Sequence, residues 1–193
     1  PCEMCIRDSA WVELQYKAKI QAFRSDRGGE FLAADFVLWL NQLGVRHQLT
    51  VPFTPQQNGM VERANRTLCG RARAMMQGAG VPERFWEHAL RYAIWCTNRT
   101  PSRRLQPPAT PYSSLHARTP DVSDARVFGC LAHVFVPSQT RRKFATHADL
   151  GVFLGIAEET KGWEFWIPAT GAFRVSRNAF FHETKFLRDS ASL

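Results

Sequence analysis

Residues 24–31 read RSDRGGEF, and residues 54–68 read TPQQNGMVERANRTL. The first stretch ends a short, partly apolar run over residues 19–25, which predicts a strand that carries Asp26 at its C-terminal edge. In the second stretch, proline and glycine interrupt regular structure before an apolar stripe at helical spacing, so Glu62 falls in the first turn of a predicted helix. Convergent carboxylates can hold divalent cations, and the pattern therefore makes Asp26 and Glu62 candidate metal ligands.

Each of these carboxylates also has a simpler interpretation. Asp26 could merely close a turn, and Glu62 could pair with Arg66 one helical turn later. Taken singly, these interpretations are the better ones. The joint spacing of the two acids and the motifs around them favour the metal-binding hypothesis.

The neighbouring residues predict alternating helices and strands. Glu30–Leu43 has apolar residues at helical spacing, and Gly44 is a suitable C-terminal cap. Val45–Val51 alternates in the manner of a half-exposed strand. A helix around Glu62 and a further helix from Pro82 to about Asn98 follow. Their apolar residues are Val61, Ala64, Leu68, Ala72 and Met75 in the first helix, and Phe85, Trp86, Ala89, Ile94 and Trp95 in the second.

The pattern changes after a proline-rich stretch at residues 101–124, where we place a connector and a domain boundary. Short β-like runs follow, and they predict four or five strands of a small barrel. The runs are Val127–Val136, Gly151–Ile156, Trp163–Pro168 and Ala172–Phe181.

Composition narrows the class of protein. The chain has 193 residues, 45% of them hydrophobic, which is enough for a sizeable core in one domain or two and excludes a disordered chain. No apolar run approaches the roughly 20 residues that cross a bilayer, so we expect a soluble intracellular protein with no membrane partner. The net charge of +8 favours a polyanionic partner, although it could equally serve solubility. Cys69, Cys96 and Cys130 lack disulfide-framework spacing and are expected to be buried thiols.

Several motifs occur in a fixed order along the chain. Together they resemble the copia-type LTR retrotransposon integrases, which are segments of Gag-Pol polyproteins. The motifs are RSDRGGEF and TPQQNGMVERANRTL as given above, PERFWEHALRYAIWCTNRTP at 82–101, TPYSSL at 110–115, RVFGCLAHVFVP at 126–137, GVFLGI at 151–156 and SRNAFFHE at 176–183.

The resemblance implies a fold and a domain organisation. Residues 10–100 would form the C-terminal half only of an α/β (α+β) ribonuclease-H-like integrase core, truncated at its N-terminus. Residues 125–185 would form a small all-β Src-homology-3-like barrel, followed by a tail at 186–193.

The resemblance also implies an activity. In the complete protein, Asp26 and Glu62 would be catalytic residues that hold Mg²⁺ or Mn²⁺, and the reaction would be metal-dependent strand transfer, in which a 3′-hydroxyl attacks a target phosphodiester. The implied partners are the element DNA ends, the target DNA and further copies of the integrase. The implied localisation is nuclear.

Residues near Glu62 are candidates for contact with DNA. Arg66 and Arg73 are expected to bind phosphates, and Asn65 to form hydrogen bonds near the metal site. Gln57 and Asn58 lie in the loop before the glutamate and could track a DNA end. A solvated basic face is the alternative for Arg73, and an ordinary polar loop is the alternative for the two loop residues.

Two features of the distal domain have weaker functional interpretations. The basic run at residues 141–143, RRK, could contact phosphates, although a solvated loop is the better interpretation. Trp163, Phe165 and Trp166 could stack on bases, but aromatic residues of a small barrel more often form its core.

The first aspartate of the family's acidic triad has no counterpart that we can identify. The only acids upstream of Asp26 are Glu3, Asp8 and Glu13, and none lies in a strand pattern. We therefore expect weakened metal binding and little or no integration activity from this chain. The cysteine pair at residues 2 and 5 has no upstream histidine pair, so no zinc is expected. Residues 4–9 look like a translated sequencing adapter, and residues 1–9 are predicted to be an artefact or a disordered leader.

Two alternatives stay open from the sequence. The chain could be a non-catalytic nucleic-acid-binding or assembly module, which salt-dependent binding without cleavage would favour. It could also be a pseudogene product that never folds, because the loss of initial strands exposes sheet edges and a core face.

Overall fold

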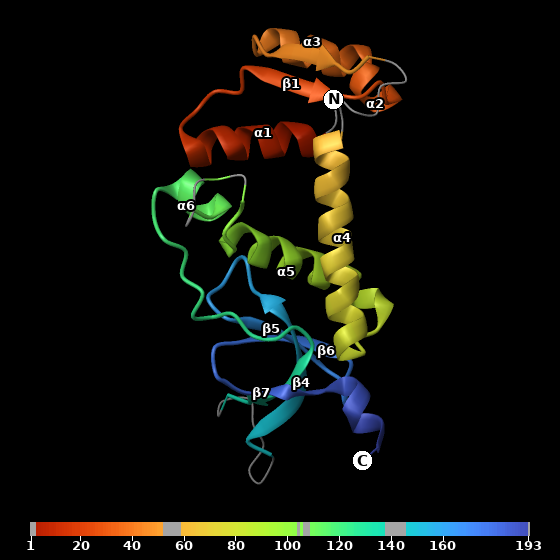
Figure 1. The fold of residues 1–193 in the computed structure, drawn as a ribbon, viewed down its shortest axis with the longest axis vertical. Coiled ribbons are helices and arrows are strands. Elements are labelled where there is room, and N and C mark those ends of the chain that lie inside the picture. The colour runs from red at the N-terminus through yellow and green to blue at the C-terminus, as the bar shows by residue number, and fades with distance from the viewer. Residues whose placement is uncertain (1–2, 52–58, 104, 106–108, 138–145, 193) are drawn as a thin grey trace. The chain divides into compact units, whose positions relative to one another are not determined.

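The computed structural model describes residues 3–51, 59–103, 105, 109–137 and 146–192. The chain divides into two compact units, residues 1–65 and 66–193, and each is described by itself. Both strands predicted for the first part of the chain are present, and the described residues of the distal part contain five strands. Figure 1 shows the course of the chain through these elements. The described residues contain no helix long and apolar enough to cross a membrane.

The first unit is an α/β arrangement built on two parallel strands. Its elements are α1 (Glu3–Tyr16), β1 (Ala22–Ser25), α2 (Gly29–Leu32), α3 (Ala34–Gln42) and β2 (Arg46–Leu49). β1 and β2 pair in parallel, from Ala22 opposite Arg46 to Ser25 opposite Leu49. A crossover between parallel strands needs a covering element, and α2 and α3 supply it. A small buried cluster of Phe36, Leu40 and Val45 holds the helices against β1.

The predicted helix from residue 30 to residue 43 is two helices, so that prediction was wrong in one respect. The chain breaks at Ala33, which has an extended ψ of 132°. Phe31 and Phe36 both pack against Phe23, with ring centroids 5.9 and 5.4 Å away. Positions five residues apart lie about 140° apart on a continuous helix, so the break lets both rings reach the same neighbour. Gly44 has a φ of 68° and ends α3 as predicted.

The helix that carries Glu62, α4, runs from Gly59 to Ala79. Only the second half of its predicted apolar stripe is buried: Ala72 is 6% exposed, whereas Val61 is 62% exposed. Met76 and Ala79 complete the buried face, and they join the core of the second unit. The apolar stripe in the sequence therefore predicts a longer buried face than α4 has.

The second long helical segment begins with a 3₁₀ turn, η2 (Glu83–Phe85), and continues as α5 (Trp86–Arg99). Pro82 precedes it at the N-cap, near the position expected for a proline. Phe85 is buried, but Trp86 is 60% exposed and was wrongly assigned to the apolar face. The proline-rich connector also contains a short helix, α6 (Pro111–His116), whose capping box is formed by Thr110 and Ser113.

The distal strands form one antiparallel sheet. Its strands are β3 (Cys130–Phe135), β4 (Ala148–Ile156), β5 (Trp163–Ile167), β6 (Ala172–Ser176) and β7 (Ala179–Phe186), in the order β6-β5-β4-β3-β7. The last predicted β-like run is two strands, because residues 177–178 make a turn between β6 and β7. Five strands were within the predicted range.

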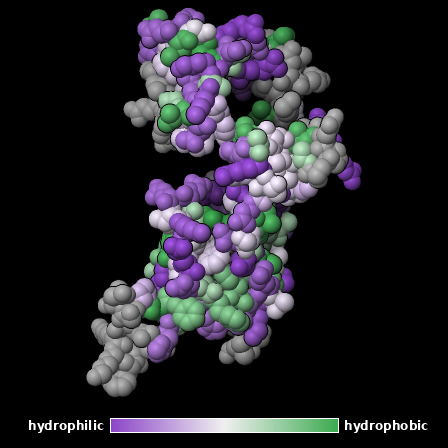
Figure 2. Space-filling view, turned by 90° about the vertical axis from the view of Figure 1, so that its left-hand side faces the viewer, coloured by the Kyte–Doolittle hydropathy of each residue, from purple (hydrophilic) through white to green (hydrophobic). Residues whose placement is uncertain are grey.

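The sheet shares one hydrophobic core with α4 and α5. Tyr92 of α5 packs edge-on against Phe153 of β4 at 5.3 Å. Gly129 has a φ of 74°, and a side chain there would come within 2.8 Å of Val81 and would also meet Ala79. The helical segment therefore packs directly on the sheet within this unit. In Figure 2 apolar surface lies among hydrophilic surface over the part that contains the sheet. The exposed large apolar residues of its strands include Phe135, Phe173, Val175 and Phe180.

Two expectations about domain limits stay predictions. The first expectation is a limit at residue 9, before which the chain would be an artefact or a disordered leader. α1 continues across this limit, and residues 3–9 are helical in the structure. Whether they are native sequence stays a prediction. The second expectation is a domain boundary within residues 101–124, between the two domains that the resemblance implies, and it stays a prediction. The buried core of the second unit includes residues on both sides of that stretch.

Candidate metal and nucleic-acid site

Asp26 follows the last residue of β1 and is exposed. Its Oδ1 accepts a hydrogen bond from the Gly28 backbone N–H at 3.0 Å. The turn-closing role that the sequence allowed is therefore real, but it engages only part of the carboxylate. An ionised carboxylate has about four acceptor sites on its two oxygens, so Asp26 retains the capacity to bind a cation.

The backbone at Asp26 is held from the neighbouring strand by His47. The Ser25 hydroxyl donates to the Asp26 carbonyl oxygen at 2.9 Å, and the same Oγ lies 2.8 Å from Nε2 of His47. Because the Ser25 proton is used in the first bond, His47 Nε2 is the donor in the second. Ser25 is only 6% exposed, so this chain of hydrogen bonds lies beneath the surface.

A second link joins the same two strands just beyond their ends. The Thr50 N–H donates to the Ser25 carbonyl at 3.0 Å, and Arg27 Nε donates to the Thr50 carbonyl at 3.3 Å. The residues on both sides of Asp26 are thus tied to the end of β2. Sequence reasoning missed His47 as a site residue, since it noted this histidine only as one position of an alternating strand.

Glu62 lies in the first turn of α4 and is exposed. A negative side chain is favourable at a helix N-terminus because the unpaired backbone N–H groups carry partial positive charge. Asn65 and Arg66, three and four positions later, are exposed, as is Arg73. These side chains are therefore accessible to a ligand, as their predicted roles require.

Some predicted site residues lie outside the described part of the chain. These are Gln57 and Asn58, in the loop before Glu62, and the basic run at 141–143. Convergence of Asp26 and Glu62 on one cation stays a prediction. Within the described ranges, no group of three or more His, Cys, Asp or Glu residues could hold a metal ion.

Glu13, the nearest acid upstream of Asp26, is already engaged. Its Oε1 accepts from the Ile20 N–H at 3.0 Å, and its Oε2 accepts from Lys19 Nζ at 2.7 Å. The hydrogen bond from Lys19, followed by the one from Ile20, lowers the pKa of Glu13. This carboxylate ties α1 to the residues before β1, with one hydrogen bond to each of its oxygens.

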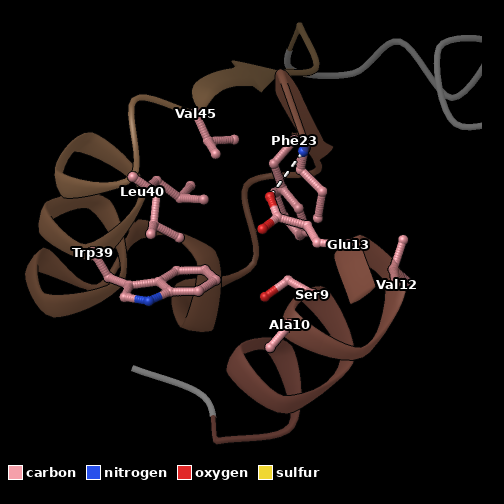
Figure 3. Close-up of a pocket in the computed structure, with 10 residues that line it drawn as sticks. Ser9, Ala10, Val12, Glu13, Phe23, Trp39, Leu40 and Val45 are labelled. Carbon is pink, nitrogen blue, oxygen red and sulfur yellow. Dashed lines mark hydrogen bonds between the residues drawn. The ribbon is translucent and has the colours of Figure 1, made fainter. Parts of the chain in front are cut away.

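Glu13 also borders the cavity of about 390 Å³ shown in Figure 3. Ala10 and Val12 of α1 lie on one side of this cavity, while Trp39 and Leu40 of α3 lie on the other. The lining is mainly apolar, and Asp26 is not part of it. The cavity is a gap between α1 and the layer of β1 and α3, separate from the candidate carboxylate site.

Trp163, Phe165 and Trp166 belong to the core of the second unit or pack against it, as expected. Phe165 is fully buried and Trp166 is 9% exposed. The Trp163 indole N–H donates to the Asp124 carbonyl at 2.9 Å. These rings are committed to packing and are not available for stacking on bases.

Three cysteines in the described ranges are free thiols. Burial raises the pKa of Cys130 to about 12 and also raises the pKa of Cys96. Cys69 is exposed, contrary to the expectation that it would be buried.

Comparison with known proteins matches the distal part of the chain to a family and most of the chain to longer proteins. Residues 130–192 match the family described as the retroviral polymerase SH3-like domain. The chain is 34% identical over 178 residues to the retrovirus-related Pol polyprotein from transposon TNT 1-94 of Nicotiana tabacum, covering 91% of this chain and 13% of that protein. It is 29% identical over 177 residues to the Pol polyprotein from transposon RE1 of Arabidopsis thaliana, covering 91% and 12%. The transposon Ty1-LR3 Gag-Pol polyprotein of Saccharomyces cerevisiae is 26% identical over 120 residues, covering 62% and 7%.

Two solved structures are distant neighbours. An intasome of simian T-cell lymphotropic virus in complex with the PP2A regulatory subunit B56 gamma gives a TM-score of 0.47 at 16% identity, covering 90% of this chain and 63% of that chain. The catalytic core domain of BIV integrase gives 0.41 at 28% identity, covering 59% and 68%.

The chain therefore joins an α/β segment with parallel strands to a β-domain that matches the retroviral polymerase SH3-like family. The predicted fold class is confirmed in outline, as a mixed α/β segment followed by an SH3-like β-domain. The sequence of the chain is similar to the Pol polyproteins of retrotransposons, as its motifs indicated. It spans about one eighth of the length of the TNT 1-94 and RE1 polyproteins that it matches.

Proposed function

We propose that this chain is the later part of an integrase that, in its complete form, inserts element DNA into host DNA by metal-dependent strand transfer. The observation that carries the proposal is the presentation of Asp26. Its carboxylate stands exposed at the end of a parallel strand, and hydrogen bonds from Gly28, Ser25 and His47 fix the turn that carries it. A rigid, solvent-accessible carboxylate is what a cation site requires.

Asp26 and Glu62 would together hold Mg²⁺ or Mn²⁺. The residues fit such an ion in kind, because Mg²⁺ is bound by one or two carboxylates completed by water and substrate phosphates. When bound, the metal would neutralise charge on the phosphodiester and activate the attacking hydroxyl. Arg66 and Arg73 would contact phosphates, Asn65 would form hydrogen bonds beside the metal site, and Gln57 and Asn58 would track a DNA end.

For the 193-residue chain by itself, the proposal is DNA binding without strand transfer. The acid nearest upstream, Glu13, holds α1 to the residues before β1 through both of its carboxylate oxygens, and it is not proposed as a third ligand. Two carboxylates hold paired metal ions poorly. The second candidate function is a non-catalytic nucleic-acid-binding or assembly module. The incomplete set of acids and the net charge of +8 favour it.

A joining assay tests the catalytic part of this proposal. The polyprotein segment that contains this chain is compared with its Asp26→Asn and Glu62→Gln variants, using element-end DNA and Mn²⁺. Strand transfer is expected to fall at least about 100-fold in either variant, since each removes a metal ligand. Asp35→Asn, which removes an exposed acid from the same unit, is the matched control. Retained strand transfer in either site variant overturns the roles assigned here.

The proposed partners and localisation need their own tests. Homo-oligomerisation of the complete protein is tested by sedimentation across a concentration series, and a concentration-independent monomer would contradict it. Nuclear localisation follows from the DNA substrate, and it is tested by imaging the tagged protein in host cells. A protein that never enters the nucleus would contradict it.

A further inference from the structure

The positive charge of this chain is concentrated in its helical middle segment, residues 63–118. That segment contains ten arginines, no lysine and only two acids, Glu83 and Glu87. Its net charge is therefore +8, which equals that of the whole chain, and the remaining residues carry fifteen basic and fifteen acidic side chains. Arginine binds phosphate through a planar fork of donors, whereas lysine acts as a point charge. A segment that uses arginine alone is suited to phosphate recognition.

Three of these arginines gather at the C-terminal end of α5, and we call Arg71, Arg99 and Arg118 the α5 arginine patch. Arg71 of α4 donates from Nη1 to Thr97 Oγ1 at 2.6 Å. Arg99 is the last residue of α5, and its Cζ lies 4.1 Å from the Trp95 ring centroid.

Tyr112 of α6 connects the other two members of the patch. Its ring centroid lies 4.9 Å from Cζ of Arg99, and its hydroxyl accepts from Nη2 of Arg118 at 2.7 Å. An unbroken series of contacts therefore runs from Arg71 through α5 and α6 to Arg118. All of it lies within the second unit.

The patch is not neutralised by carboxylates. In the described ranges, no ion pair joins any of its three guanidinium groups to an acid. Elsewhere in the same unit Arg91 pairs with Glu164, and Arg174 and Arg188 have aspartate partners, Asp149 and Asp189. Arg84 and Arg126 of the same unit also lack an acidic partner in the described ranges, and each lies over two aromatic rings. The patch differs from them in bringing three such arginines together.

Arg99 also has an unsatisfied donor. Its Nη1 donates to the Trp95 carbonyl at 3.3 Å, but its Nε is buried without a hydrogen-bond partner among the described residues. Arg71 and Arg118 are exposed, so a ligand can reach both flanks.

A purely structural interpretation explains part of this arrangement. Arg99 satisfies a carbonyl in the last turn of α5, and Arg118 ties α6 to the chain that follows it. That interpretation accounts for the individual contacts. It does not account for three adjacent cations without one acidic partner, which repel each other unless an anion is bound.

We propose that the α5 arginine patch binds the phosphate backbone of DNA, and that it forms a second contact surface besides Arg66 and Arg73. This inference rests on the proposed function, because it names a further surface for the same polyanion. Contacts of this kind neutralise phosphates and release counterions, so they appear in the salt dependence of binding.

The test measures the affinity of the full 193-residue chain for a fluorescent DNA duplex by anisotropy at several salt concentrations. The Arg71→Gln/Arg118→Gln double variant is compared with Arg174→Gln/Arg188→Gln, which removes the same charge from ion-paired sites. The slope of log K against log salt is expected to fall by about 2 in the patch variant, since each lost phosphate contact removes about 0.9. In the control it should change by less than half of that.

The outcomes separate the two proposals. The wild-type chain could bind with a salt-dependent affinity while the slope of log K against log salt falls equally in the two double variants. That result would overturn the proposed role of the α5 arginine patch and leave the proposal of DNA binding standing. If the wild-type chain does not bind even at low salt, both proposals fail. Should the patch variant fail to fold, Arg118→Gln alone is used, because its hydrogen bond to Tyr112 is exposed, and a slope loss of about 1 is then expected.

Discussion

Tyr92 and Arg126 form two hydrogen bonds through one hydroxyl group. The Tyr92 hydroxyl donates to the Arg126 carbonyl at 2.6 Å and accepts from the Arg126 N–H at 3.0 Å. Tyr92 is 4% exposed, so α5 satisfies both backbone groups of a residue 34 positions away beneath the surface. This contact fixes the chain that leads into β3 against the helix.

Tyr92→Phe is therefore expected to destabilise the protein by about 1–3 kcal/mol, because it leaves the partly buried backbone groups of Arg126 without their partner. Urea unfolding measures the change. Tyr112→Phe is the matched control, since it removes a hydroxyl that binds only the exposed Arg118, and its effect should stay within about 0.5 kcal/mol. Equal effects of the two variants would refute the role given to Tyr92.

Gly129→Ala is expected to destabilise the protein more than Gly171→Ala. Both glycines have a φ near 70°, so both substitutions strain the backbone by about 1–2 kcal/mol. Only at Gly129 would the new methyl group meet Ala79 and Val81, whereas nothing lies within 4 Å at Gly171. The difference in unfolding free energy should exceed about 1 kcal/mol, as overpacking does. Similar values would show that α4 and the sheet do not approach as closely as described.

Stability should fall in alkaline solution because of Cys130. Burial raises the pKa of this thiol to about 12 from 9.0, so the folded protein keeps a proton that the unfolded chain releases above pH 9. The associated stability is complete below pH 9 and is lost as the pH rises towards 12. Between pH 8.5 and 10, the wild-type protein should lose about 1 kcal/mol more than Cys130→Ala. Cys69→Ala, at an exposed thiol, should behave like the wild type. An identical pH dependence in Cys130→Ala would contradict this account.

His47 is predicted to be a positioning residue for Asp26. His47→Ala removes the donor to Ser25, which should loosen the turn and weaken Mn²⁺ binding about threefold or more. His47→Gln retains a side-chain N–H donor and should restore part of the affinity. Mn²⁺ binding is measured by water proton relaxation, with Arg46→Ala at the neighbouring exposed position as control. If alanine and glutamine give the same affinity as the wild type, the hydrogen bond does not serve the metal site.

Much of this architecture could be predicted from local patterns. The ends of β1 and α3 followed from Gly28 and Gly44, since both turns depend on nearby residues alone. The break at Ala33 was not predictable, because its cause is the packing of Phe31 and Phe36 on Phe23, a residue eight positions or more away. Periodicity likewise could not show that Val61 and Trp86 are exposed while their helices are otherwise amphipathic.

Some residues of the candidate site could likewise be predicted from local motifs, and others could not. The flanking motifs were enough to predict Asp26 and Glu62 as metal ligands, a role that stays a prediction. His47 and the α5 arginine patch were not visible, because their partners come from other elements: Ser25 lies 22 positions from His47, and Thr97 lies 26 positions from Arg71. Contacts across such distances require the fold, although the lysine-free basic segment at 63–118 was a signal in the sequence.

The central claim is that Asp26 and Glu62 bind one and the same cation. Its most direct test is a Mn²⁺ titration of the isotope-labelled chain, followed by paramagnetic broadening of backbone amide signals. The account predicts that the signals around both residues broaden with one dissociation constant, and that Glu62→Gln weakens the broadening around Asp26. Broadening around Asp26 that is indifferent to Glu62→Gln would mean two independent surface carboxylates and would contradict the account.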